Sequence, residues 1–284
     1  PTRIVHIADV DISAATGMGR VAVHWQHEAA RRGKVGRLRH PALKTRLAFP
    51  LWRLWGADRG LRRSTRIFVL NQQDAAFAQR YYRRTADDVF VFSNGVEPTS
   101  VTAANAPSSD FTVLFLGSWL ARKGVATLVG AAEALAERGT SVRWLLAGTG
   151  VDANSIRRQF PPRQRATVEV IPTFSPDDEE RLLRQAHVFV LPSFFEGQPL
   201  ALLQAMAAGR CCVTTDCCGQ RDLIQHDHNG LLFPPGDAAG LATLLTRCLD
   251  DSALRLRLGT AARESVATRS WPQTSAAVFD QNHA

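Results

Sequence analysis

The chain has 284 residues, 45% of them hydrophobic, which is enough for a substantial core and favours two domains over one. Lys and Arg outnumber Asp and Glu by 34 to 26, and this net charge of +8 attracts phosphate groups in general. The chain contains neither a run of eighteen apolar residues nor a recognisable nucleic-acid-reading motif, so we expect neither a membrane span nor a nucleic-acid partner.

Residues 1–97 predict a small α/β domain. An apolar strand at 3–8 reads as part of a buried sheet rather than as a secretory signal. Gly17 and Gly19 follow this strand and precede a helix, and by themselves they predict only a tight turn. His40, before a proline in a loop, is a weak site candidate, and an ordinary surface histidine is the favoured interpretation. Strand, helix and strand patterns follow at 66–70, 72–83 and 89–92.

Residues 42–63 combine six basic side chains with Phe49, Trp52 and Trp55. A helix of this composition can lie on an anionic membrane surface, with tryptophan at the headgroup level and arginine against the lipid phosphates. An amphipathic helix that packs on the core explains the same pattern. We weigh the two interpretations equally and keep an anionic membrane surface as a candidate partner.

A small, polar and proline-containing stretch at 98–109 predicts a linker, and strands and helices then alternate regularly over 110–269. The apolar runs are rich in Val, Leu and Phe without polar alternation, which is typical of parallel strands buried on both faces. Strands are expected at 111–116, 142–147, 167–171, 187–191, 211–215 and 230–233, and helices at 123–138, 152–160, 176–185, 199–208, 237–249 and 251–268. This pattern predicts a doubly wound sheet, whose ligand lies beyond the carboxyl ends of the strands.

The segment from Gly117 to Gly124 follows the first of these strands and opens a helix. It places Arg122 and Lys123 at a helix N-terminus, where positive charge is unfavourable to the helix dipole. A bound anion would offset that cost, whereas two solvated surface cations explain this segment equally well when it is taken alone. Gly148, which follows the next strand, predicts a turn.

The stretch from Phe194 to Met206 is the most informative of the chain. Glu196 lies in a turn, and Gly197-Gln198-Pro199 leads into an apolar helix. We expect Pro199 to be the first helical residue, because its fixed φ is helical and it has no N–H to leave unpaired. The unpaired N–H groups of the first turn would form an anion site beside a carboxylate, which suits a sugar diphosphate. For an isolated motif of this kind, a solvated acidic turn is the simpler interpretation.

Together these segments resemble glycosyltransferase family 4, whose members are retaining enzymes with two facing Rossmann-like domains, the GT-B fold. The resemblance rests on short segments along most of the chain: Asn94-Gly95-Val96, Phe115-Leu116-Gly117-Ser118 with Arg122-Lys123-Gly124, Leu145 to Gly150, Val190 to Ser193, Gly230-Leu231-Leu232 with Pro235-Gly236-Asp237, and Ser270-Trp271. It implies an acceptor-side domain at 1–97 that a crossover helix at 270–284 completes, a linker at 98–109, and a donor-binding domain at 110–269.

The resemblance also implies roles for individual residues. Lys123 and Arg122 neutralise the diphosphate of a nucleotide-sugar donor, Glu196 holds hydroxyls of the transferred sugar, and Gly17 and Gly19 close over the phosphates. Further contacts are implied with the donor at Gly117, Ser118, Gly148, Thr173, Phe174, Gly197, Gln198, Pro199, Leu200, Ala201 and Gln204, and with the acceptor at His40. The nucleotide sugar is a substrate, and no cofactor or metal is required, because fixed cations and amides stabilise the charge on the leaving diphosphate.

Three departures from the family pattern have consequences. Gln204 replaces a glutamate that contacts the nucleotide ribose, so an acceptor carbonyl is kept but a charge is lost. Ser118 stands where an arginine is common, and Arg122 can compensate. The first domain is unusually short, because several strand–helix units that family members carry are missing in the region of 34–39.

We therefore expect an enzyme that moves a sugar from an NDP-sugar to a glycan, lipid-linked or small-molecule acceptor in surface-polysaccharide or glycolipid assembly. Gln204 and the short first domain leave two alternatives open: a non-catalytic relative that binds a nucleotide sugar or a partner protein, and a sugar-nucleotide epimerase. Five cysteines, an odd number without zinc-ligand spacing, favour a cytoplasmic protein without a metal site. The segment 42–63 would hold such a protein at the inner face of the membrane.

Overall fold

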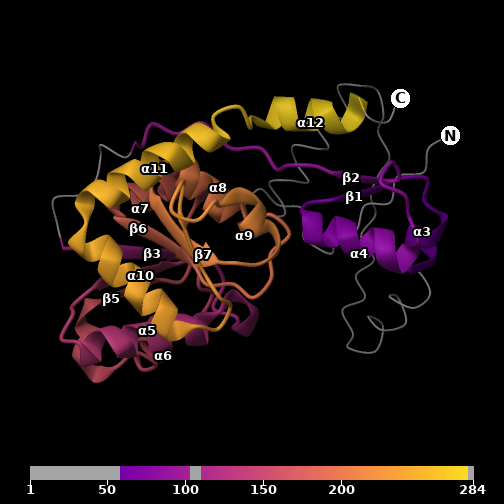
Figure 1. The fold of residues 1–284 in the computed structure, drawn as a ribbon. Helices are drawn as coiled ribbons and strands as arrows, with labels where there is room; N and C mark the ends of the chain where they lie inside the picture. The colour runs from indigo at the N-terminus through magenta and orange to yellow at the C-terminus, as the bar shows by residue number, and fades with distance from the viewer. Residues whose placement is uncertain (1–57, 103–109, 281–284) are drawn as a thin grey trace. The chain divides into compact units, whose positions relative to one another are not determined.

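The computed structural model describes residues 58–102 and 110–280 (Figure 1). The chain divides into two compact units, one formed by Pro1–Gly95 with Trp271–Ala284 and the other by Val96–Ser270. Among the described residues, no helix has both the length and the apolar character that a membrane crossing requires. The second unit contains the large sheet that positions the candidate site.

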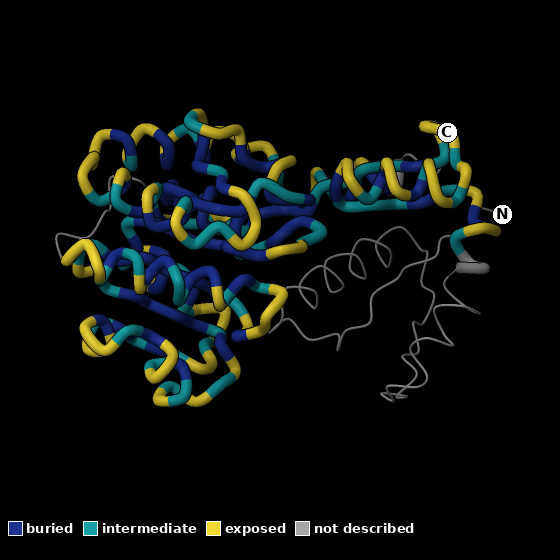
Figure 2. The backbone as a smooth tube through the Cα atoms, turned by 60° about the horizontal axis from the view of Figure 1, so that its bottom comes forward, coloured by how far each residue is buried: buried dark blue, intermediate teal, exposed yellow. Residues whose placement is uncertain are grey.

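The larger unit is built on a six-stranded sheet with the order β5-β4-β3-β6-β7-β8. Its strands are β3 Thr112–Leu116, β4 Arg143–Ala147, β5 Val168–Ile171, β6 Val188–Leu191, β7 Cys211–Thr215 and β8 Leu231–Phe233. Every neighbouring pair is parallel, and each strand begins within one residue of its predicted start. Figure 2 shows the strands as the buried centre of this unit. The predicted doubly wound parallel sheet is therefore confirmed.

Both faces of this sheet are buried because successive side chains of a strand enter different hydrophobic clusters. In β3, Val113 and Phe115 belong to one cluster, and Leu114 and Leu116 belong to the other. Helices α5 and α10 pack on the first cluster and α7 and α8 on the second (Figure 1). The helices and 3₁₀ turns of the unit are η3 Ala121–Lys123, α5 Val125–Glu137, α6 Ala153–Arg157, η4 Pro162–Thr167, η5 Pro176–Asp178, α7 Glu179–Gln185, α8 Leu200–Ala207, α9 Cys218–Leu223, α10 Ala238–Asp250 and α11 Ser252–Val266.

The helix predicted at 123–138 is divided in the structure. The turn η3 ends at Lys123, Gly124 adopts a left-handed φ of 70°, and α5 begins at Val125. A left-handed residue cannot continue an α-helix, so Arg122 and Lys123 lie in the turn before α5 and not in its first turn. The dipole penalty expected for these two cations is correspondingly smaller, because the effect falls off within the first turn of a helix.

The start of α8 also differs from the prediction. Pro199 is the N-cap of α8 and not its first helical residue, because its ψ of 117° is extended, and the helix begins at Leu200. The short helix α9 was not predicted at all. Its first residue, Cys218, has a φ of 45°, a local conformation that no hydrophobic pattern indicates.

The strand order places a topological switch point between β3 and β6. From β3 the chain proceeds through β4 to β5 on one side, and from β6 through β7 to β8 on the other. The loops that follow β3 and β6 therefore diverge from a common point at the carboxyl edge of the sheet. In open α/β sheets this crevice is the usual position of the ligand.

The smaller unit is described only in part. Strands β1 Ile67–Val69 and β2 Val89–Val91 form a parallel pair, and α4 Gln72–Tyr82 packs on them. Helix α3 Asp58–Arg63 precedes these elements, and α12 Trp271–Asp280 belongs to the same unit. Gly95 lies so close to the start of α12 that a Cβ there would come within 2.5 Å of the Trp271 Cα.

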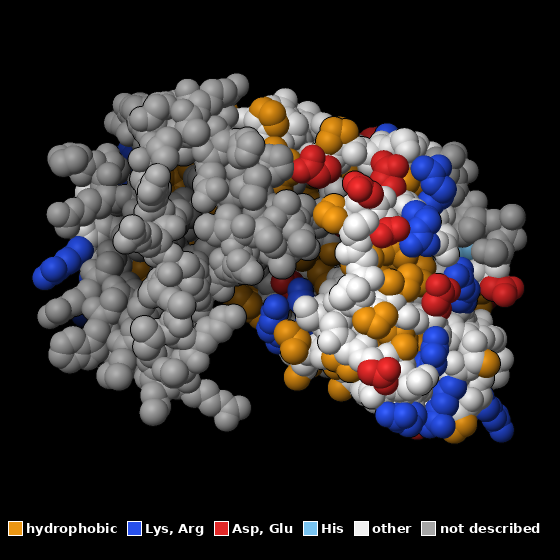
Figure 3. Space-filling model, turned by 180° about the vertical axis from the view of Figure 1, so that it is seen from behind, with side chains coloured by type: hydrophobic (Ala, Val, Ile, Leu, Met, Phe, Trp, Pro, Cys, Tyr) orange, Lys and Arg blue, Asp and Glu red, His pale blue; other side chains and the backbone are white. Residues whose placement is uncertain are grey.

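Charged side chains on the described surface are mixed in sign. Figure 3 shows basic and acidic side chains next to one another on one face of the molecule. In α7, Arg181 lies 3.1 Å from Asp178, and Arg184 lies 3.8 Å from Glu180. Exposed pairs of this kind stabilise a fold by about 1 kcal/mol at most.

Arg210, in contrast, is a buried cation that holds three loops by their carbonyl groups. Its guanidinium donates to Ala186 O at 3.0 Å, to Ala208 O at 3.1 Å and to Thr102 O. Burial lowers the pKa of Arg210 to about 10. At neutral pH the group is still charged, so the three charge-assisted bonds must offset its loss of hydration.

Replacing Arg210 with alanine is expected to destabilise the larger unit by about 3 kcal/mol, because it leaves buried carbonyls unpaired and opens a cavity. For a unit of this size that corresponds to a Tm lower by roughly 6–12 °C in a calorimetric scan. Arg184→Ala removes an exposed arginine of the same unit and should lower the Tm by less than about 3 °C. Equal shifts for the two variants would contradict the role assigned to Arg210.

Candidate functional site

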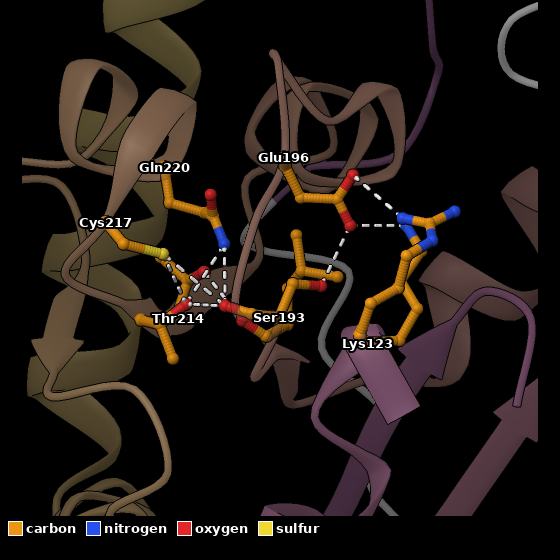
Figure 4. A network of polar contacts seen from close by, with 9 residues as sticks. Lys123, Ser193, Glu196, Thr214, Cys217 and Gln220 are labelled. Atoms are coloured by element: carbon orange, nitrogen blue, oxygen red, sulfur yellow. Dashed lines mark hydrogen bonds and ion pairs between the residues drawn. The ribbon is translucent and has the colours of Figure 1, made fainter. Parts of the chain in front are cut away.

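Three charged side chains meet at the carboxyl ends of β3 and β6 (Figure 4). Lys123 Nζ, from the loop after β3, bonds to Glu196 Oε1, from the loop after β6. Ser193 Oγ donates to the same oxygen at 2.8 Å, and Arg122 lies 3.9 Å from Glu196 Oε2. The Lys123 and Glu196 side chains are only 15% and 11% exposed, whereas Arg122 is 56% exposed. Lysine and glutamate thus form a largely buried pair with a second cation at its solvent edge.

Backbone contacts hold the two loops against each other. Phe194 N–H donates to Arg122 O at 2.9 Å. Gly124 lies directly against the second loop, and a Cβ at this position would come within 1.8 Å of Pro192 O. Only glycine fits there, both because of this contact and because of its left-handed φ. The positions of the Lys123 and Glu196 backbones are therefore coupled through the loops themselves.

The loops after β3, β4 and β5 are joined in the same way. Gly117 N–H donates to Ala147 O and Gly148 N–H to Ile171 O, each at 2.9 Å. Gly148 has a φ of 73°, and a Cβ there would lie 2.9 Å from the ring of Phe174. The loops therefore bring one group of expected donor residues to a single edge of the sheet: Gly117, Ser118, Gly148, Thr173 and Phe174.

The N-terminus of α8 opens directly after Glu196. Pro199 is its N-cap, and no side chain caps the helix. Gln198 and Pro199 are buried, whereas Gly197, Leu200 and Ala201 are partly exposed. The first backbone N–H groups of a helix and its positive dipole end favour an anion. Together with Lys123 and Arg122, this helix end makes the corner between β3 and β6 suitable for a phosphate or diphosphate group.

Gln204 uses its amide carbonyl inside the protein. Its Oε1 accepts a hydrogen bond from Glu97 N–H at 3.1 Å. This contact could not be predicted from the sequence, because 107 residues separate the two positions. A carbonyl oxygen has a second lone pair, so the expected contact between Gln204 and a ribose hydroxyl stays a prediction.

Replacing Gln204 with glutamate is expected to tighten nucleotide binding about fivefold, because a hydrogen bond to a charged acceptor is stronger by about 1 kcal/mol. The carboxylate can still accept from Glu97 N–H, so the fold should be unaffected. Isothermal titration of the parent and the variant with the same nucleoside diphosphate measures the change. An unchanged Kd would place the ribose away from residue 204.

Several expected site residues lie outside the part of the chain that the structure describes: Gly17, Gly19 and His40, together with most of the segment 42–63. The structure in turn adds side chains that the sequence did not point to. Ser193 follows β6, Thr215 ends β7 and Gln220 lies in α9, and the three meet beside the turn that carries Glu196. The available signal was that each lies at or shortly after the end of a predicted strand, but serine, threonine and glutamine are common at such positions.

Solved structures share this architecture. Sucrose-phosphate synthase from Thermosynechococcus elongatus superposes with a TM-score of 0.70 at 23% identity, over 85% of this chain and 63% of that chain. Anabaena HepE, solved in complex with UDP-glucose, superposes with a TM-score of 0.64 at 17% identity, over 80% of this chain and 68% of that chain. The likeness shows the GT-B fold of glycosyltransferases, so the fold class expected from the sequence is confirmed.

The chain belongs to the family described as "Glycosyl transferases group 1", whose pattern matches residues 110–251, half of the chain. A putative colanic acid biosynthesis glycosyltransferase, WcaL of Escherichia coli (strain K12), is 31% identical over 168 residues, which are 56% of this chain and 41% of WcaL. The chain spans about half of the length of the curated relatives that it matches. The resemblance to a glycosyltransferase family is thereby confirmed.

Proposed function

We propose that this protein is a retaining glycosyltransferase of family 4 that moves a sugar from an NDP-sugar to a glycan, lipid-linked or small-molecule acceptor. The contact between Lys123 and Glu196 at the switch point, beside the N-terminus of α8, carries the proposal. Membership of a glycosyltransferase family supports transfer over the two alternatives, binding without catalysis and epimerisation. The UDP-glucose in the HepE structure supports a nucleotide sugar as the donor.

In the proposed reaction, the bond between the anomeric carbon and the diphosphate oxygen breaks. The acceptor hydroxyl bonds to that carbon on the face that retains the configuration, and its proton passes to the departing diphosphate. Negative charge builds on the leaving diphosphate, and its proposed stabilisation comes from Lys123, Arg122 and the first N–H groups of α8. Their position together at this corner supports the assignment. Glu196 accepts hydrogen bonds from the sugar hydroxyls and orients the donor. Because these groups supply the positive charge, the proposed reaction needs no metal or cofactor.

The proposed setting is the assembly of surface polysaccharide or glycolipid, on the cytoplasmic side of a membrane. The colanic acid assignment of WcaL supports this setting. The basic segment 42–63 is the proposed contact with anionic lipid. Flotation of the protein with liposomes tests that contact, and equal flotation with neutral and anionic liposomes would argue against it.

A thermal-shift screen with UDP, GDP, ADP and TDP tests the proposed function at its first step, because a ligand that binds the folded state raises the Tm. The nucleotide that stabilises the protein is then supplied with different sugars, and donor turnover is followed in EDTA. NMR of the anomeric proton in the product decides between retention and inversion. Failure of all four nucleotides to raise the Tm would contradict the proposal.

A further inference from the structure

The loop that carries Glu196 is held from a second side by the end of β7 and the first turn of α9. Gly219 N–H donates to Glu196 O at 3.1 Å. Gly219 is also in contact with the next peptide group, since a Cβ there would lie 1.9 Å from Gly197 O. The turn at Glu196 therefore lies between the Lys123 loop on one side and residues 215–220 on the other.

Gln220, Thr215 and Cys217 make side-chain contacts between these two segments. Gln220 is fully buried, and its Nε2 donates to Ser193 O at 3.2 Å and to Thr215 Oγ1 at 3.0 Å. Thr215 Oγ1 in turn donates to Ser193 O. Figure 4 shows the Gln220 amide directed to Ser193, while the Ser193 hydroxyl points to Glu196. Ser193 thus accepts hydrogen bonds at its backbone carbonyl and donates one from its hydroxyl to the Glu196 carboxylate.

The other half of the Gln220 amide has no partner among the residues that the structure describes. Its Oε1 is buried without a hydrogen bond, one of a few such atoms in the described part of the chain. A buried carbonyl that is left unpaired costs free energy, and a methionine of similar shape would avoid that cost. The fold alone therefore gains little from an amide at this position.

We propose that Gln220 is a positioning residue for sugar recognition, an inference that rests on the proposed function. Together with Thr215 and Cys217, it holds the Ser193 carbonyl, and so the backbone from which Ser193 Oγ reaches Glu196 Oε1 at 2.8 Å. The Glu196 carboxylate is then held between Ser193 and Lys123, oriented to accept hydrogen bonds from the donor sugar. Gln220 acts on the sugar and not on the nucleotide.

The variant Gln220→Met separates this role from a structural one. It removes the unpaired carbonyl along with the two donated bonds, so the Tm should be equal to or above that of the parent. The Kd of the free nucleoside diphosphate should stay within about twofold, because Lys123 and α8 are unchanged. The preference for the nucleotide sugar over the free nucleotide, a ratio of two Kd values, should fall at least about fivefold.

Gln164→Met is the matched control, because Gln164 is also a buried glutamine that donates to a loop carbonyl. Its Nε2 bonds to Thr140 O at 3.1 Å, and its Oε1 accepts from Trp144 Nε1, so both ends of this amide are paired. Its loss should lower the Tm and leave the preference for the nucleotide sugar unchanged. The two variants are thus expected to give opposite results in the two measurements.

Amide hydrogen exchange distinguishes failure of this inference from failure of the proposed function. Residues 193–198 should exchange faster in Gln220→Met than in the parent and in Gln164→Met, whatever the protein binds. Unchanged exchange there, or an unchanged preference for the nucleotide sugar, would overturn the role of Gln220. A parent that binds no nucleotide sugar would overturn the proposed function instead.

If Gln220→Met does not fold, Gln220→Glu gives the same test through pH. A buried carboxyl has a raised pKa, and its protonated form can donate to Ser193 O where the ionised form cannot. The preference for the nucleotide sugar should then recover as the pH falls, relative to the parent at each pH. A ratio that stays level with pH would contradict the inference.

Discussion

Replacing Lys123 with alanine is expected to lower kcat for sugar transfer by a factor of about 100 to 1,000. Loss of one preorganised group that stabilises charge in a transition state costs about 3–4 kcal/mol. The Lys123 side chain is only 15% exposed, so water cannot readily replace its charge. Lys123→Arg keeps the charge but not the shape and should retain more activity than the alanine variant. Steady-state kinetics at saturating donor measure both effects.

Arg143→Ala is the control for this prediction. Arg143 forms an ion pair with Glu169 at 2.6 Å, in the same sheet but at the start of its strand. This variant removes the cation that pairs with Glu169, which lies outside the candidate site. The value of kcat should therefore change less than about twofold. A Lys123→Ala variant that turned over donor as fast as Arg143→Ala would reject the role of Lys123 in stabilising the diphosphate.

The variant Glu196→Gln is expected to lower kcat/KM for the nucleotide sugar about thirtyfold to a hundredfold. Hydrogen bonds to a charged acceptor contribute about 1.5–3 kcal/mol, and the neutral amide loses most of that contribution. Binding of the free nucleoside diphosphate should become equal or tighter, because a negative charge next to Lys123 and Arg122 is removed. The two effects have opposite signs, which a general loss of structure cannot produce.

Titration calorimetry with the free nucleotide and kinetics with the nucleotide sugar measure these two effects separately. Glu169→Gln serves as the control, since Glu169 is the carboxylate of the pair with Arg143. If Glu196→Gln weakened both ligands equally, the carboxylate would be a structural group and not a contact to the sugar. Equal kcat/KM values for Glu196→Gln and Glu169→Gln would exclude Glu196 from the site.

The strands could be predicted because a strand that is buried on both faces has an apolar side chain at nearly every position. In β6, Val188–Leu191, every side chain is buried, and the sequence shows a short apolar run without polar positions. Helix starts were less predictable, because single backbone conformations decide them. The left-handed Gly124 delays α5, and the extended Pro199 delays α8. A hydrophobic pattern contains no information about either dihedral angle.

The residues of the candidate site could be named from the sequence, but not their contacts. Lys123 and Glu196 are 73 residues apart, and they meet because β3 and β6 are neighbours in the sheet. Lysine was expected at the diphosphate and glutamate at the sugar, and a bond between the two was not predicted. Gln220 was missed because its importance lies in a contact with Ser193. Helix α9 and the loop after β6 come together only because β6 and β7 are neighbours in the sheet.

A crystal structure with the nucleoside diphosphate that raises the Tm most tests the central claim directly. The diphosphate is expected to lie in the corner between β3 and β6, within hydrogen-bonding distance of Lys123 Nζ and of the first backbone N–H groups of α8. A nucleotide bound elsewhere on the protein, with Lys123 still paired only to Glu196, would contradict the account.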